Sequence, residues 1–126
     1  MRPEKPDSWD AVLSTHAGTV VSAARALEAL IRAEAPGLEV RFDPGTGLLA
    51  FGWSMRMRDL VFALIPHAGW VNLQLADGAI LPDSGGLVEG TGKRIRHVKV
   101  RSAEAAAAPA VRDLVRAQLE VRPREA

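Results

Sequence analysis

The sequence contains no cysteine and no tyrosine among its 126 residues. Without cysteine the chain has no disulfide, no thiol nucleophile, and no thiolate ligands for zinc or an iron–sulfur cluster. Aromatic residues make up only 5% of the chain, so platforms on which nucleic-acid bases could stack are scarce. The formal net charge is +1, which gives no overall field that would attract nucleic acid. These absences argue against nucleic acid as a partner.

Long hydrophobic runs are also absent. The longest, Leu60–Ile65, is far shorter than the roughly 20 residues that are needed to span a bilayer. The N-terminal residues include acids and prolines, and no unbroken apolar segment of the kind found in signal peptides follows them. We therefore expect a cytoplasmic protein that makes no contact with a membrane.

The composition is that of an ordinary globular protein, with 48% hydrophobic and 25% charged residues. A chain of this length matches one domain and can bury a core without a metal ion or a cross-link. We expect a single domain over residues 1–126, with flexible ends at residues 1–6 and 122–126.

Apolar residues at helical spacing run from Leu13 to Ile31 and predict an N-terminal helix. Ser8 is suited to cap the start of this helix, and Gly18 could divide it into two pieces. A second helix is predicted at the C-terminus, where Pro109 is suited to its first turn. Its buried side is marked by Val111, Leu114, Val115, Gln118 and Leu119.

Between these helices, apolar and polar residues alternate with a period of two, which is typical of half-buried strands. The segment Leu60–Ile65 is apolar on both sides, which suits a central strand that is covered on both faces or an overlap of two layers. Because the strands are consecutive, we expect an α+β fold with both helices on one face of an antiparallel meander. About five strands are predicted: Leu38–Phe42, Leu48–Trp53, Leu60–Ile65, Val71–Leu75 and Arg94–Arg101.

The densest polar cluster lies at the last predicted strand, where five cations and no acid occur within Lys93–Arg101. The glycines before it leave backbone N–H groups bare, and such groups can hold an anion. The phosphate-loop spacing is not met, because Leu87 stands where that motif needs glycine and Arg94 where it needs serine or threonine. The alternative is an exposed edge strand whose cations deter aggregation. The predicted ligand site comprises Gly90, Thr91, Gly92, Lys93, Arg96 and His97.

Three acids, Asp77, Asp83 and Glu89, lie in or near the long connection Leu81–Gly92 and could converge in space. Acids in loops are more often turn formers than catalysts. His97 could be a general base or simply a packed strand residue. No set of acid, base and nucleophile is recognisable, so we assign no catalytic residue, and no histidine pair has the spacing of metal ligands.

Three stretches resemble the signature of the YdhG-like bacterial domains, a large and mostly uncharacterised family: Gly78–Asp83, Gly86–Lys93 and Arg96–Val100. The order of helices and hairpins is also similar, so the resemblance covers nearly the whole chain. It implies a frataxin-like fold, with two helices packed on an antiparallel sheet. At least one relative is described as an intracellular iron chaperone, so the resemblance also implies iron as a candidate ligand.

Three functions remain open. The leading expectation is a small non-enzymatic binding protein for an anionic small molecule or an acidic protein surface. The first alternative is an iron chaperone, and the second is an enzyme that uses His97 or a loop carboxylate. An iron chaperone would need clustered acids. The N-terminal helix instead mixes its acids with arginines, so the residues themselves predict no metal and no cofactor.

Assembly is predicted from the edges of the sheet, because a strand with unpaired backbone groups tends to find a partner. Charges guard the strand Arg94–Arg101, whereas Val71–Leu75 has few charges near it. We therefore expect a homodimer that forms through the sheet or through the helix face.

Overall fold

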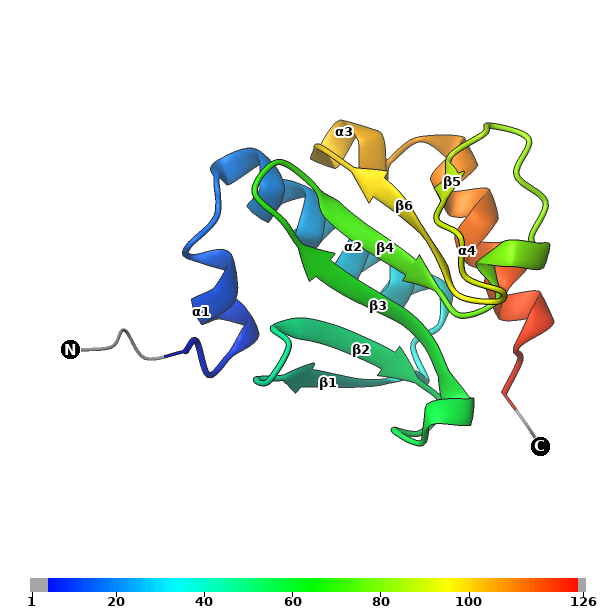
Figure 1. Ribbon diagram of the computed structural model, residues 1–126, viewed down its shortest axis with the longest axis horizontal. Coiled ribbons are helices and arrows are strands. Elements are labelled where there is room, and N and C mark those ends of the chain that lie inside the picture. The colour runs from blue at the N-terminus through cyan, green and yellow to red at the C-terminus, as the bar shows by residue number, and fades with distance from the viewer. Residues whose placement is uncertain (1–4, 125–126) are drawn as a thin grey trace.

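The computed structural model describes residues 5–124 and shows an antiparallel sheet with helices packed against it (Figure 1). The predicted α+β class is confirmed. The ends predicted to be flexible lie partly outside the described residues, at 1–4 and 125–126. The sheet has six strands in the order β1-β2-β3-β4-β6-β5. Their bounds are β1 Glu39–Asp43, β2 Leu48–Gly52, β3 Leu60–Pro66, β4 Val71–Leu75, β5 Val88–Glu89 and β6 Arg96–Val100.

The N-terminal helical segment forms two helices, α1 (Trp9–Leu13) and α2 (Gly18–Glu34). The Ser8 hydroxyl caps α1 by accepting a hydrogen bond from the Ala11 backbone N–H at 3.1 Å. Since α2 begins at Gly18, both the predicted cap and the predicted division at this glycine are confirmed.

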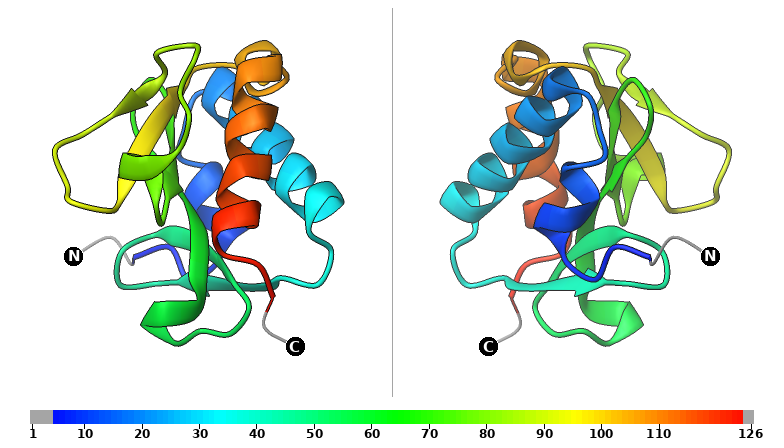
Figure 2. Two further views of the ribbon diagram at one scale, coloured as in Figure 1. Left: turned by 90° about the vertical axis from the view of Figure 1, so that its right-hand side faces the viewer. Right: turned by 90° about the vertical axis from the view of Figure 1, so that its left-hand side faces the viewer.

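The C-terminal part contains the single-turn helix α3 (Ala103–Ala106) and the longer α4 (Pro109–Val121), which begins at the predicted Pro109. Figure 2 shows α2 and α4 on the same side of the sheet, as predicted. The core lies between these helices and the strands. Its fully buried side chains include Val20, Leu27, Ile31, Phe51, Leu64, Leu73, Leu75 and Val115.

The strands β1 to β4 form the predicted meander, but the far end of the sheet differs from the prediction. Val88 and Glu89 form β5, which pairs with Val98 and His97 of β6. The strand expected as an exposed edge, Arg94–Arg101, is therefore shielded by β5 along part of its length. A two-residue strand inside a glycine-rich connection has too little periodicity to be recognised in a sequence.

The strand Val71–Leu75 is also not an edge, because β4 lies between β3 and β6 and pairs with both. Its low charge reflects this interior position. A homodimer could therefore not form by pairing along β4, which corrects that part of the assembly prediction.

The four consecutive residues Val61–Leu64 of β3 are all buried, so this strand is buried on both sides, as predicted. Figure 2 shows α2 and α4 on one face of the sheet only, and the outward residues of β3 remain apolar. Among residues 5–124, no helix has the length and apolar character needed to cross a membrane.

Candidate binding cavity on the open sheet face

The open face of the sheet, opposite α2 and α4, is hollowed over β2, β3 and β4. Side chains alternate between the two faces of a strand, so the register that pairs Ala50 with Ala63 and Ala63 with Gln74 places these three in one outward row. Small alanine side chains on two neighbouring strands leave space that larger residues would fill. The result is a cavity of about 320 Å³ with a largely apolar lining, called the sheet cavity below.

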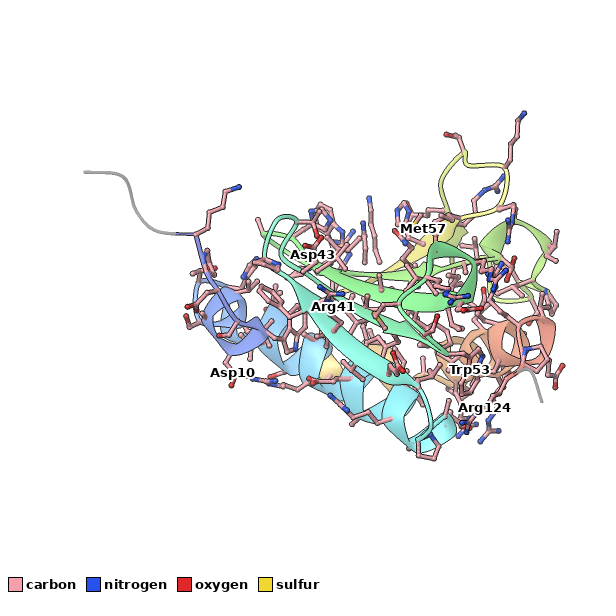
Figure 3. The ribbon with its side chains drawn as sticks, turned by 90° about the horizontal axis from the view of Figure 1, so that it is seen from below. Asp10, Arg41, Asp43, Trp53, Met57 and Arg124 are labelled. Carbon is pink, nitrogen blue, oxygen red and sulfur yellow. The ribbon has the colours of Figure 1, made fainter. Side chains whose placement is uncertain are left out.

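Two segments that are distant in the sequence form walls of the sheet cavity. The short 3-10 helix η1 (Met57–Asp59) contributes Met57 and Arg58, and the turn before β6 contributes Arg94 and Ile95. Met57 is 80% exposed and Ile95 is 50% exposed. Figure 3 shows Met57 on the side of the sheet that faces away from α2. Two apolar side chains thus stand in water beside an apolar cavity.

One end of the sheet cavity adjoins a buried carboxylate, Asp77, which directly precedes the 3-10 helix η2 (Gly78–Ile80). Asp77 is only 7% exposed. Arg122, at the end of α4, donates from Nε to Oδ2 and from Nη2 to Oδ1 of Asp77, each at 2.9 Å. Gln118 is fully buried, donates to Oδ2 at 2.8 Å and accepts from the Asp77 backbone N–H at 2.7 Å. Asp77 therefore fixes the end of α4 against the end of β4.

Hydrogen bonding governs the charge state of this carboxylate. The bonds from Arg122, and after it those from Gln118 and Arg94, hold the pKa of Asp77 well below its usual range. Burial opposes this effect, because it favours the neutral acid. Asp77 is consequently an anion throughout the physiological pH range, and it in turn raises the pKa of Arg122.

The same network positions a wall of the sheet cavity. Arg122 donates from Nη1 to the backbone carbonyl of Arg58, and the Arg122 carbonyl accepts a hydrogen bond of 2.8 Å from Trp53 Nε1. The segment between β2 and β3 is thereby attached to the end of α4. The expected flexible tail therefore does not include its first residue, because Arg122 makes four hydrogen bonds in this network, with Asp77, Trp53 and Arg58.

The predicted anion site lies beside the sheet cavity, in the turn between β5 and β6. Gly90 has a φ of +113°, and a Cβ atom there would lie 3.5 Å from both Arg96 Cδ and His97 Nδ1. Gly90, Arg96 and His97 are therefore close together. Arg96 and His97 are nevertheless successive residues of one strand, so their side chains leave opposite faces of the sheet.

The rest of the predicted anion site is more dispersed. Arg96 Nε donates to the backbone carbonyl of Gly92 at 2.8 Å, so the oxygen of Gly92 faces this cation. Thr91 and Lys93 are exposed in the turn. His97 lies across the register from Gln74, which lines the sheet cavity, and so it stands next to the cavity rather than in its lining.

The three loop acids have separate partners. Asp77 belongs to the network with Arg122, whereas Asp83 accepts hydrogen bonds from the backbone N–H groups of Leu87 at 2.8 Å and Val88 at 2.9 Å. Asp83 thus shapes the turn. Glu89 lies across from His97 but forms its ion pair with Lys99 at 3.6 Å. Within residues 5–124 no group of three or more histidine or acidic side chains could hold a metal ion.

The opposite end of the open face is polar. Trp70 stacks on His67 with ring centroids 5.0 Å apart, and its Nε1 donates to Asn72 Oδ1 at 2.8 Å. The Lys99 ammonium lies 4.9 Å and the Arg101 guanidinium 5.5 Å from the Trp70 ring centroid. The face therefore changes from apolar at the sheet cavity to basic and aromatic beyond it.

Sequence reasoning missed the sheet cavity and the Asp77 network. Two signals were present: the apolar character of Leu60–Ile65 on both sides, and the polar Gln118 within the apolar stripe of α4.

Comparison of the chain with protein-family models, with curated proteins and with solved structures found no match. The YdhG-like resemblance and the frataxin-like fold stay predictions.

Proposed function

We propose that this chain is a non-enzymatic binding protein for a small molecule that combines an apolar body with an anionic group. The ligand lies in the sheet cavity, with its anionic group toward the arginines of the walls. The observation that carries this proposal is an apolar hollow on a sheet face that neither α2 nor α4 covers. We propose the cytoplasm as the location.

The apolar part of the proposal is supported by the outward residues of the central strands. Ala50, Val61 and Ala63 are apolar although they lie on the face without helices. Removing apolar surface from water stabilises a complex by roughly 25 cal/mol per Å². A volume of about 320 Å³ is at the lower end of the roughly 300–1,000 Å³ that ligand pockets span, which favours a compact ligand.

The anionic part is supported by charge. Arg58, Arg94 and Arg122 line the sheet cavity, and Asp77 is the carboxylate that pairs with two of them. Lys93, Arg96 and His97 of the sequence-predicted site lie in the neighbouring turn and strand and do not line the cavity. An acidic side chain of a partner protein offers the same chemistry as a free carboxylate. Such a partner would also need an apolar side chain beside that acid, to fill the apolar part of the cavity.

Binding is favoured over catalysis by the lining itself. Among the described residues that line the sheet cavity, none is a serine, threonine, histidine or carboxylate. Arginine stays protonated and serves poorly as a general base. The lining supplies apolar contact and positive charge, which suffice to bind a ligand.

A second copy of the chain is the competing occupant of this face, because a dimer could bury Met57 and Ile95. Light scattering at high protein concentration distinguishes the two. A mass near 13.5 kDa leaves the sheet cavity open to a small ligand and contradicts the expected homodimer. A dimer that dissociates when Met57→Ser is introduced would instead identify this face as the interface between copies.

The proposal is tested with decanoate as the probe, by calorimetry on the wild type and two variants. Ala63→Leu fills the cavity from its floor and should weaken binding by about tenfold or more, because the apolar body loses its space. Ala33→Leu adds the same atoms to an exposed position of α2 and should leave the affinity unchanged. Circular dichroism verifies that both variants fold. Absence of decanoate binding, or equal affinity in Ala63→Leu and the wild type, would overturn the proposal.

A further inference from the structure

We infer that the anionic group of the ligand is a single carboxylate and that Arg94 receives it by exchanging its bond with Asp77. This inference rests on the proposed function and names the chemical class of its ligand. It assigns different roles to the three arginines around the sheet cavity.

Asp77 holds four donors from side chains, and they are unequal. Arg122 contributes two bonds of 2.9 Å and Gln118 one of 2.8 Å, whereas the bond from Arg94 Nη2 to Oδ1 measures 3.2 Å. The Arg94 side chain is also 67% exposed. If Arg94 turns away, Asp77 keeps three bonds and a neutralising guanidinium. The exchange costs little, because the Arg94 guanidinium is largely in water and Asp77 keeps its principal partner Arg122.

Arg122 cannot play this part. Its side chain is only 17% exposed, and its guanidinium is engaged by both oxygens of Asp77 and by the Arg58 carbonyl. A ligand that took Arg122 would leave Asp77 buried without its principal partner, which is costly. Arg122 is therefore a positioning residue, which keeps η1 and the end of α4 in place around the cavity.

Arg58 and Arg94 remain available for the ligand. Both side chains are exposed, and they line the sheet cavity from different segments, η1 and the turn before β6. An anion at this end of the cavity would be attracted by both guanidinium groups. Arg94 is the primary receiver, because its partner Asp77 is satisfied without it.

The charge at this end favours a monoanion. The ion-paired cluster at this end, which joins Arg94 and Arg122 to Asp77, holds two arginines and one carboxylate. One positive charge is therefore in excess, and a carboxylate neutralises it. A phosphate monoester carries about −1.5 to −2 at neutral pH and would leave uncompensated negative charge in the complex.

The test compares three ligands with the same ten-carbon chain: decanoate, decanol and decyl phosphate. Wild-type protein should bind decanoate about tenfold more tightly than decanol, because the charged hydrogen bond forms only with the carboxylate, and more tightly than decyl phosphate. Arg94→Gln should bind decanoate and decanol with similar affinity, and its affinity for decanol should equal that of the wild type. Lys93→Gln removes the adjacent cation, which does not line the cavity, and should keep the full preference for decanoate.

The outcomes separate this inference from the proposed function. If all variants bind decanol and decanoate equally, the cavity binds ligands but the carboxylate assignment is wrong. If the preference survives Arg94→Gln and is lost in Lys93→Gln, the anion lies in the turn between β5 and β6, and the assignment to Arg94 is wrong. Tighter binding of decyl phosphate than of decanoate overturns the single-carboxylate class. If none of the three ligands binds, the proposed function fails and this inference fails with it.

Discussion

Arg122 and Asp77 are joined by two parallel hydrogen bonds of 2.9 Å, although the two residues lie 45 positions apart in the sequence. This pair connects the last turn of α4 to the end of β4, and Gln118 completes it from one turn earlier in the same helix. Bidentate pairs of arginine and carboxylate combine energy with a fixed geometry. The pair therefore determines where α4 ends and how the wall of the sheet cavity is held.

The first prediction concerns Asp77→Asn. Removing one partner of a buried ion pair leaves the other charge uncompensated, so we expect a loss of about 3 kcal/mol in the free energy of unfolding at pH 7. Urea titration of the wild type and the variant measures this loss. Asp113→Asn, an exposed carboxylate on α4, is the control and should change the free energy by less than about 0.5 kcal/mol.

The same variant predicts a change in acid sensitivity. The pKa of Asp77 is lowered in the folded state, so its stabilising contribution is present above about pH 4, the usual range of an unfolded aspartate, and is lost as the pH falls further. The difference in the free energy of unfolding between the wild type and Asp77→Asn should therefore shrink as the pH falls below about 4. Parallel stability profiles of the two proteins over this range would contradict the assignment.

The second prediction concerns Gln118→Leu, a substitution of similar size in a fully buried position. It removes the acceptor of the Asp77 backbone N–H and one donor to the Asp77 carboxylate, and we expect a cost of about 1–3 kcal/mol. A double-mutant cycle with Asp77→Asn measures the coupling. Additive costs would show that Gln118 acts independently of Asp77, contrary to the network described.

The third prediction uses glycines as a matched pair. A Cβ atom at Gly78 would lie 2.6 Å from Arg96 Cβ, closer than two such atoms can approach, whereas at Gly69 there is open space. Gly78→Ala should therefore lower the free energy of unfolding by about 1–3 kcal/mol, because η2 and β6 must separate. Gly69→Ala should change it by less than about 1 kcal/mol in either direction. Equal melting temperatures for the two variants would contradict the close approach of these segments.

The helices and the long strands could be predicted because their signals are local. The spacing from Leu13 to Ile31, the Ser8 cap and the break at Gly18 depend only on neighbouring residues, and the structure has all three. The two residues of β5 could not be found in this way, since they are a strand only by virtue of their pairing with β6. Local periodicity contains no information about which strand lies at an edge.

The cavity and the Asp77 network depend on contacts between distant residues. The sequence shows that Leu60–Ile65 is apolar on both sides, but this pattern is the same whether a second layer covers the outer face of the strand or a cavity lies over it. The sequence marks Asp77 as a candidate, but its pattern places the partner Gln118 on the buried face of a helix and Arg122 in a flexible tail. Their convergence follows from the packing of α4 against the sheet, which no spacing along the chain encodes.

The last prediction concerns iron, which the YdhG-like resemblance implies as a cargo. An iron site on the N-terminal helices would need the acids Asp10, Glu28 and Glu34. Each of them forms an ion pair with an arginine: Asp10 with Arg25, Glu28 with Arg25 at 3.2 Å, and Glu34 with Arg116 at 2.7 Å. A hard cation requires several clustered oxygen ligands, and here it would have to displace guanidinium groups that already neutralise them. We therefore expect calorimetry with ferrous iron under anaerobic conditions to show no saturable binding. Arg25→Gln frees Asp10 and leaves Glu28 with Arg32 as its remaining arginine partner. This variant tests whether the arginines are the reason, because any weak iron binding should then increase. Saturable binding by the wild-type protein that disappears when Asp10, Glu28 and Glu34 are neutralised together would contradict this prediction and favour the chaperone.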